Sequence, residues 1–509
     1  MYEVRAASVE WNPNAERLRE LTEKMPNSQI TEFGNVVVKA RVDSRSTKST
    51  FIVDDSTNAT KQTITREEFE RVAAEQDAYI ADSDMVVVDG YIGSDPDFRT
   101  RARLIMEAAN ANVAGMQQQL YYPAGDDYDP AAWVPDTTVI YTPNLAVPGY
   151  PGDRLIAVDL AGNVTRVLNS DYFGESKKGG LRMWNNIVYN RGGLALHAGC
   201  KVIPQNGSPT AILIVGLSGT GKTTTTFTTQ LDSKPAQDDF VALMPGGRVY
   251  TTENGCFAKT FGLDPKFEPA IYYATTKPDA YLENVSVDAE GKVDFFDTSY
   301  TKNGRTTWPF SYVDPWPGNE LPSAEFLLIL NRNQNILPGV ARLDRAQAAA
   351  YFMLGETTGT SAGGKDEEGK FLRVPGTNPF FPRDMADMGN RMLELLDSHE
   401  MKVFVLNTGR VGGTDDAASK KVTIPYSSAT VQAIVQDTIE WVTDPDFGYE
   451  IAASLPGVDD IEILQPRRLY ERQGRLAEYD AMAARLKQER KEFLGSFPGL
   501  NEEIVKSIG

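Results

Sequence analysis

One short stretch of the chain has the residue types and spacing that bind the phosphates of a nucleotide. The pattern G-x-x-x-x-G-K-[ST] is met by Gly216-Leu217-Ser218-Gly219-Thr220-Gly221-Lys222-Thr223. Glycines let backbone N–H groups surround phosphate oxygens, and the N-terminus of a following helix adds partial positive charge. We expect Lys222 to reach the β- and γ-phosphates and Thr223 to bind Mg²⁺ through its hydroxyl, with Thr224 completing the loop.

Three more side chains near this loop have the chemistry of metal ligands. Asp238 and Asp239 are adjacent carboxylates, and such a pair either binds a metal ion or forms a solvated turn. His197 is one of two histidines in the chain and lies shortly before the loop. A single histidine either packs in the core or acts as a ligand. The residue types alone leave both interpretations open at each position.

The elements around the loop suit nucleotide chemistry. TAILIVGL (210–217) is a short continuous apolar run, typical of a strand that is buried on both faces. AEFLLILNR (324–332) and MKVFVLNTG (401–409) are similar runs, and RDMADMGNRMLELLDSHE (383–400) between them is helical in pattern. This alternation predicts an α/β nucleotide-binding core.

The first part of the chain has a different pattern of predicted elements, with helices and a hairpin. Residues 13–25 and 65–81 have the patterns of helices, the second opened by a capping threonine. Residues 150–168 predict a hairpin around Ala161-Gly162-Asn163. We therefore expect a mixed α/β protein with an α+β substrate-binding domain over 1–195 and a P-loop domain over 196–509.

The second domain has two further expected parts. The Gly-rich segment Gly355–Pro379 is long for a connection and is either a lid or a surface excursion. The last residues form a charged helical extension. We expect the active site in the cleft between the two domains.

Composition and charge exclude several classes of protein. The net charge is −19, from 70 acidic and 51 basic residues, which disfavours nucleic acid and anionic lipid as partners. Two cysteines exclude a disulfide framework and a cysteine-rich zinc site. No apolar run approaches the length that spans a bilayer, so a cytoplasmic monomer or small homo-oligomer is the expectation.

Several segments resemble the ATP-dependent phosphoenolpyruvate carboxykinases, in the same order along the chain. The closest is GLSGTGKTT, the phosphate loop itself. The others are Arg45-Ser46-Thr47-Lys48, Tyr172–Gly179 (YFGESKKG), His197 in LALHAG, Asp238-Asp239, Gly255–Thr260 (GCFAKT), Leu282-Glu283-Asn284-Val285, Arg305 in GRTTWP, Leu337–Leu343 (LPGVARL) and Asn407-Thr408-Gly409. The resemblance covers about residues 40–410.

The resemblance implies a reaction and its cofactors. Oxaloacetate and ATP give phosphoenolpyruvate, CO2 and ADP, reversibly, as a step of gluconeogenesis. The enolate made by decarboxylation attacks the γ-phosphate, and its oxygen needs a Lewis acid. The implied cofactors are ATP or another phosphoryl donor, Mg²⁺ and Mn²⁺, and the implied partners are small molecules.

The resemblance also assigns roles to particular residues. Lys178, His197 and Asp239 bind the Mn²⁺, and Asp238 completes the acidic pair. A lysine ligand must be neutral, so its pKa must be strongly lowered. The remaining roles are substrate and nucleotide contacts. Arg45 holds the substrate carboxylate, Tyr172 flanks the same pocket, Arg305 bridges substrate and γ-phosphate, and Lys259 and Glu283 lie with the nucleotide.

One departure from the family keeps the phosphoryl donor open. Family members have a Thr-Arg pair in the segment that contacts the base and ribose, whereas KKVTIPYSSATVQAIV (420–435) has no arginine near Ser427 and Ser428. Two alternatives therefore stand beside the carboxykinase. One is a kinase on the same fold that phosphorylates another small molecule or a protein serine. The other is a nucleotide-binding regulatory protein without catalysis.

Overall fold

The computed structural model describes residues 2–56, 61–217, 219–318, 320–359, 369–415 and 417–508. These residues form two compact units. Unit 1 contains the described residues of 2–188 and 251–315, and unit 2 contains those of 189–250, 316–359 and 369–508.

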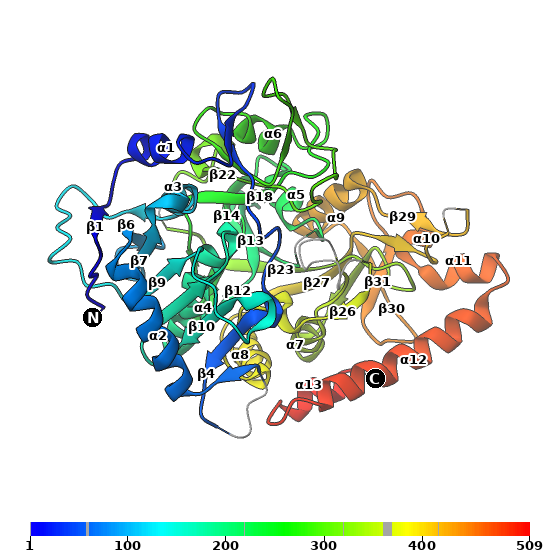
Figure 1. Cartoon of the computed structure of the whole chain (residues 1–509). Coiled ribbons are helices and arrows are strands. Elements are labelled where there is room, and N and C mark those ends of the chain that lie inside the picture. Colours follow the sequence, from blue (N-terminus) through cyan, green and yellow to red (C-terminus); the bar gives the residue numbers. More distant parts are fainter. Residues whose placement is uncertain are drawn as a thin grey trace. The chain divides into compact units, whose positions relative to one another are not determined.

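Unit 1 is built around a large mixed sheet (Figure 1). Its strands run in the order β1 (Ser8–Trp11), β6 (Asp84–Ile92), β7 (Thr100–Glu107), β9 (Thr137–Thr142), β11 (Val164–Leu168), β10 (Leu155–Asp159), β4 (Thr50–Val53) and β5 (Thr63–Ile64), and β8 (Tyr122–Pro123) pairs with β6. β10 and β11 form the antiparallel hairpin that the sequence predicts. β7, β9 and β11 are parallel neighbours, so the sheet combines both kinds of pairing.

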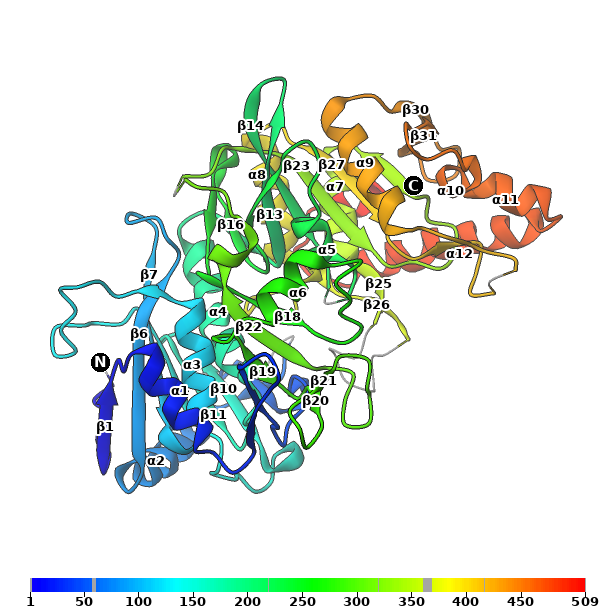
Figure 2. The same ribbon diagram turned by 90° about the horizontal axis from the view of Figure 1, so that it is seen from above.

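Helices cover the faces of this sheet. α2 (Arg66–Ala81) starts at Thr65, whose side chain accepts the Glu68 N–H as expected for a cap, and it buries its apolar side on the sheet. α4 (Phe173–Asn190) approaches β11 closely, because a Cβ on Gly179 would lie 3.2 Å from Cγ2 of Thr165. α1 (Ala15–Glu23) and α3 (Ala111–Leu120) lie side by side (Figure 2).

A smaller sheet in unit 1 joins segments from distant parts of the chain. Its order is β18 (Gly255–Lys259), β22 (Arg305–Pro309), β19 (Tyr281–Glu283), β3 (Val36–Val38) and β2 (Ser28–Ile30). β19 pairs in parallel with β3. This pairing places residues 251–315 in unit 1, although the sequence expectation divided the chain once, after residue 195.

Unit 2 is built around a second mixed sheet. Its order is β15 (Lys234–Gln237), β13 (Ala198–Gln205), β14 (Ser208–Val215), β23 (Ala324–Asn331), β27 (Lys402–Asn407), β24 (Val340–Leu343), β31 (Glu450–Ser454) and β30 (Glu440–Thr443). The three apolar runs of the sequence form β14, β23 and β27, which are parallel neighbours. The predicted α/β core is confirmed.

The central strands of unit 2 are buried on both faces. On one face Leu213 and Val215 pack with α7 (Arg345–Leu354) and α8 (Met385–Ser398). On the other face Ile212 and Ile214 pack with α9 (Ile424–Gln436). Alternate side chains of one strand point to opposite faces, which explains why the strands are apolar throughout.

The C-terminal residues are helical, as predicted, and belong to the core of unit 2. They form α10 (Ile461–Leu464), α11 (Pro466–Arg472), α12 (Leu476–Gly495) and α13 (Glu502–Lys506). Leu486 and Leu494 of α12 pack in the same cluster as α7 and α8. Of the segment Gly355–Pro379, residues 360–368 lie outside the described residues; β25 (Glu356–Thr358) and β26 (Phe371–Arg373) pair on either side of them.

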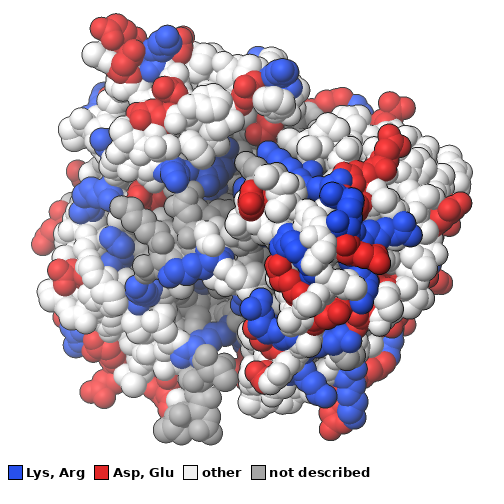
Figure 3. Space-filling model, turned by 90° about the vertical axis from the view of Figure 1, so that its right-hand side faces the viewer, with Lys and Arg blue, Asp and Glu red and all other residues white. Residues whose placement is uncertain are grey.

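The apolar character of the helices and the distribution of charge both bear on function. In the described parts of the chain, none of the helices has both the length and the apolar character needed to cross a bilayer. Although the net charge is −19, Lys and Arg side chains gather in groups on the face drawn in Figure 3. Local groups of this kind are what an acidic protein needs in order to bind an anion.

Candidate active site

The phosphate loop of unit 2 has the backbone that its glycines predict. It leaves the end of β14 and enters α5, which runs over Lys222–Phe227. Gly219 and Gly221 have φ values of 86° and 97°, in the left-handed region where side chains are strained. Lys222 is 5% exposed. Ser218 is a predicted loop residue that lies outside the described residues.

Side chains from neighbouring strands hold the loop in shape. Thr220 donates its hydroxyl to the Leu217 carbonyl at 2.7 Å. Thr408, just beyond β27, donates to the Thr220 carbonyl at 2.7 Å, and Arg332, just beyond β23, donates to the Gly219 carbonyl at 3.2 Å. Because β14, β23 and β27 are parallel, their carboxyl ends meet at one edge of the sheet, where ligands of such sheets bind.

Lys222 and His197 meet at one carboxylate oxygen. Lys222 Nζ lies 2.5 Å and His197 Nε2 lies 3.0 Å from Oδ1 of Asp239. His197 Nδ1 lies 2.7 Å from the Thr377 carbonyl oxygen, which can only accept, so Nδ1 carries a proton. In the neutral imidazole Nε2 then presents a lone pair to Asp239.

A divalent cation fits this arrangement. A ligating histidine usually donates its other N–H to a carbonyl or carboxylate, as His197 does. A lone pair that faces a carboxylate oxygen is favourable only with a proton or a cation between them. Within the described residues no three His, Cys, Asp or Glu side chains gather in one group. Of the predicted ligands in unit 2, His197 and Asp239 are in contact, while Asp238 and Thr223 are the sequence neighbours of Asp239 and Lys222.

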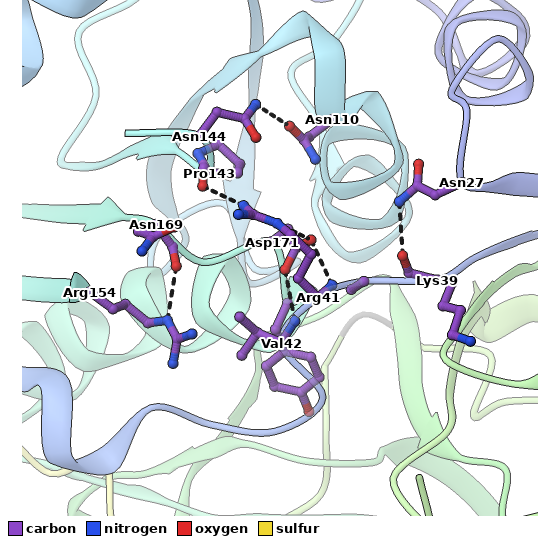
Figure 4. Close-up of polar contacts among 12 residues, drawn as sticks. Asn27, Lys39, Arg41, Val42, Asn110, Pro143, Asn144, Arg154, Asn169 and Asp171 are labelled. Carbon is purple, nitrogen blue, oxygen red and sulfur yellow. Dashed lines mark hydrogen bonds and ion pairs between the residues drawn. The ribbon is translucent and has the colours of Figure 1, made fainter. Parts of the chain in front are cut away.

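In unit 1, two carboxylates fix the segment that carries Arg45, and Figure 4 shows the contacts of one of them, Asp171. Asp171 accepts the backbone N–H groups of Arg41 and Val42 at 2.8 and 3.0 Å. Glu175 accepts the N–H of Ser46 at 2.7 Å. The Arg41 guanidinium also contacts Asp171 and donates to the Pro143 carbonyl at 2.7 Å. Arg45 is therefore held from both sides by residues that flank Tyr172.

Tyr172 is linked to the same segment through its hydroxyl. The Asn303 amide donates to Tyr172 Oη at 3.4 Å and to the Asp43 carbonyl at 2.6 Å. Tyr172 is 3% exposed, and burial raises the pKa of its phenol while the nearby Arg305 opposes the shift. The structure thus brings Tyr172, Arg305 and the segment that carries Arg45 together from three distant parts of the sequence.

Three predicted residues form a row across the smaller sheet. Arg305 in β22 is the direct partner of Lys259 in β18 on one side and of Glu283 in β19 on the other. Side chains that are directly opposite on neighbouring strands share one face of the sheet. The Arg305 guanidinium lies 5.0 Å from the centre of the Phe257 ring, and Lys177 Nζ lies 5.5 Å from the same centre.

Glu283 contacts the backbone of α4. It is fully buried, and its Oε1 accepts the Phe173 N–H at 2.8 Å. Its other oxygen is buried and has no hydrogen-bond partner within the described residues. Burial raises the pKa of Glu283 to about 8, opposed by the Phe173 N–H and by Arg305 and assisted by Asp171. The carboxyl group therefore holds the start of the helix that carries Lys178.

Three features of this site were missed from the sequence. Asp171 and Glu175 clamp the Arg45 segment, and Lys177 forms a buried ion pair with Glu253 at 3.0 Å. Glu175 and Lys177 stand inside the YFGESKKG segment, so the motif was a usable signal for them. Asp171 lies just before that segment, and no pattern in the sequence marks it.

The fold and these residues define a class of protein. A phosphate loop at the carboxyl edge of a parallel core, with an imidazole and the loop lysine on one carboxylate, is typical of a P-loop phosphoryl-transfer protein. Comparison with known proteins gives the family. The family model described as phosphoenolpyruvate carboxykinase matches residues 7–461.

Individual relatives agree with that match. The phosphoenolpyruvate carboxykinase (ATP) of Aeropyrum pernix is 32% identical over 97% of this chain and 96% of its own length. Those of Mesorhizobium japonicum and Rhodopseudomonas palustris are each 31% identical over 94% of this chain and 90% of their own lengths. The chain belongs to the phosphoenolpyruvate carboxykinase family, as its motifs predicted.

Proposed function

We propose that this chain converts oxaloacetate and ATP to phosphoenolpyruvate, CO2 and ADP, and catalyses the reverse reaction. The observation that carries the proposal is that Lys222 and His197 converge on Asp239. A P-loop that only transfers phosphate to a hydroxyl needs its lysine, its threonine and Mg²⁺. The imidazole adds a ligand for a second cation, which the chemistry of an enolate requires.

The residues of unit 1 serve the keto acid. Arg45 offers a planar fork of N–H donors that matches a carboxylate, and the clamp of Asp171 and Glu175 fixes its backbone in advance. Tyr172 is held by Asn303 beside the same segment. In the reaction the bond between C3 and the leaving carboxylate breaks, CO2 departs, and the electron pair becomes the enolate of pyruvate.

Phosphoryl transfer follows the loss of CO2. The enolate oxygen attacks the γ-phosphorus, and the bond to the bridging oxygen of ADP breaks. Lys222 and the loop N–H groups hold the phosphates, and the roles that the family resemblance gives to Arg305 and Lys259, which pair in one row, are to balance the charge that spreads over the γ-phosphate. Fixed cations of this kind act without reorganising during the step.

The metals supply one part of the chemistry. When bound, a divalent cation acts as a Lewis acid that lowers the energy of negative charge on the enolate oxygen. His197, Asp239 and Lys178 would hold it, while Thr223 and Asp238 would hold the Mg²⁺ of the nucleotide. The Thr377 carbonyl keeps the His197 proton on Nδ1, so Nε2 stays available as a ligand.

A coupled assay tests this function. Phosphoenolpyruvate, bicarbonate and Mn²⁺ would be supplied with ADP, GDP or inorganic phosphate in turn, and malate dehydrogenase would report oxaloacetate. We expect turnover with ADP that is lost in Lys222→Ala and in His197→Ala. Turnover with GDP or phosphate instead of ADP would still establish carboxykinase activity, but it would show that the phosphoryl donor is not ATP.

A binding measurement makes a negative result informative. Folded wild-type protein that binds ATP and Mn²⁺ but gives no oxaloacetate with any acceptor would overturn the proposal. Mn²⁺ affinity in His197→Ala is the matched test of the metal site. We expect it to fall by about tenfold or more, because the variant loses one of few ligands.

A further inference from the structure

A buried lysine underlies the phosphate loop, outside the predicted set of site residues. Lys201 lies in β13 and has no exposed surface. Its neighbour Cys200 packs on the α7 and α8 side of the sheet, so Lys201 points to the opposite side. No carboxylate of the described residues forms an ion pair with it. A buried lysine without a counter-ion is expensive and calls for a specific use.

The ammonium group is used at the end of the loop's helix. Lys201 Nζ donates to the carbonyl oxygens of Thr225 and Thr228 at 2.9 and 3.1 Å, and to the side-chain oxygen of Gln230. Thr225 lies in the last turn of α5, and Thr228 is the residue that ends it. The last carbonyls of a helix lack partners within it, and a cation placed there is favourable.

Two more contacts hold the end of α5 in place against β13 and α9. Gly199, two residues before Lys201, lets β13 approach α5, since a Cβ there would lie 2.0 Å from Oγ1 of Thr226. Gln230 passes the contact on, because its amide donates to the Ser428 hydroxyl of α9 at 2.9 Å. The same short helix therefore begins at Lys222 and ends on a cation that is tied to α9.

We propose that Lys201 is a positioning residue for nucleotide binding, which sets α5, and with it Lys222 and the loop N–H groups, by fixing the far end of the helix. α5 is too short to be rigid by its own hydrogen bonds. Gln230 extends this control to α9. Burial lowers the pKa of Lys201 to about 7.

The inference rests on the proposed function only for its kinetic test. In the coupled assay, Lys201→Met keeps the length of the side chain and removes its donors. We expect the KM for ADP to rise about tenfold, the size of a lost helix-end cation contact, and the KM for phosphoenolpyruvate to stay within about twofold. Gln230→Leu leaves two acceptors in place and should raise the KM for ADP by about threefold.

The controls separate this inference from the proposed function. Lys402→Met changes a half-exposed lysine of β27 in the same sheet and should leave both KM values within about twofold. Calorimetric titration of the full chain with ATP and Mg²⁺ needs no turnover, so it tests Lys201 even if the chain is not a carboxykinase. If Lys201→Met does not fold, the affinity for ATP and the KM for ADP of Gln230→Leu test the inference instead. Folded variants with unchanged affinity for ATP and an unchanged KM for ADP would overturn the inference.

Discussion

The phosphate loop of unit 2 and the set of candidate site residues in unit 1 are built in opposite ways. The loop is one continuous stretch, Gly216 to Thr223, whose shape follows from its glycines and from the strand before it. The unit 1 set comes from segments near residues 45, 172, 259, 283 and 305, which meet only through sheet pairing and side-chain clamps.

Because of this difference, we expect different kinds of substitution to disturb the two regions. The loop's shape follows largely from its own sequence, and it needs few outside contacts, such as those of Thr408 with Thr220 and of Lys201 with the end of α5. The set in unit 1 depends on every residue that fixes the register of its strands or holds one of its segments in place. We therefore expect substitutions around the Arg45 segment to alter substrate binding, and substitutions around the phosphate loop and α5 to alter nucleotide binding. The following experiments can break that separation.

The largest effect is expected in the loop itself. Lys222→Met removes the cation that contacts Asp239 and that we propose holds the phosphates, and should lower kcat by about 10³-fold or more. Binding of phosphoenolpyruvate, measured by titration in the absence of nucleotide, should stay within about twofold of wild type. A large loss of phosphoenolpyruvate binding would show that the two regions are not separable in this way.

A comparable effect, on stability, is expected at the buried pair of unit 1. Lys177→Met takes the cation away from the buried Glu253 carboxylate and should lower the free energy of unfolding by about 3–5 kcal/mol. Lys177→Met combined with Glu253→Gln should recover part of that loss, since no uncompensated charge remains. Urea unfolding of the single and double variants measures both; equal losses in the two would contradict the coupling.

Next in size is a pH effect at Glu283. Its folded pKa is about 8, whereas an unfolded glutamate titrates at about 4.3, so the folded state binds the extra proton. This stabilisation is complete below about pH 4.3 and is lost as the pH rises through about 8. Each pKa unit is about 1.4 kcal/mol. Glu283→Gln should therefore keep a higher Tm than wild type at pH 8, and the gap should close toward pH 5; parallel Tm curves would refute this.

The smallest effect is expected at the clamp. Asp171→Asn turns an amide toward N–H groups of Arg41 and Val42 and should raise the KM for phosphoenolpyruvate about tenfold, with the KM for ADP nearly unchanged. Asp136→Asn, at a half-exposed ion pair of the same unit, is the matched control. A rise in the KM for ADP instead would place Asp171 outside substrate binding.

Much of unit 2 was predictable because its signals are local. The apolar runs of β14, β23 and β27 report burial on both faces, and the G-x-x-x-x-G-K-T loop reports its own backbone. In unit 1 the helix over 66–81 and the hairpin around Gly162 followed from a cap and a turn. The return of residues 251–315 to that unit did not, because no local pattern records which strand pairs with β3.

The sequence by itself determined the loop, its strand, the order of the family motifs and the excess of acidic charge. Only the tertiary structure decided that Arg305 stands between Lys259 and Glu283, that Asp171 fixes the Arg45 segment, and that Lys201 ends α5. The physical reason is how far along the chain each interaction reaches. Backbone conformation and burial pattern are set by neighbouring residues, whereas strand register and the partner of a buried charge depend on residues far along the chain.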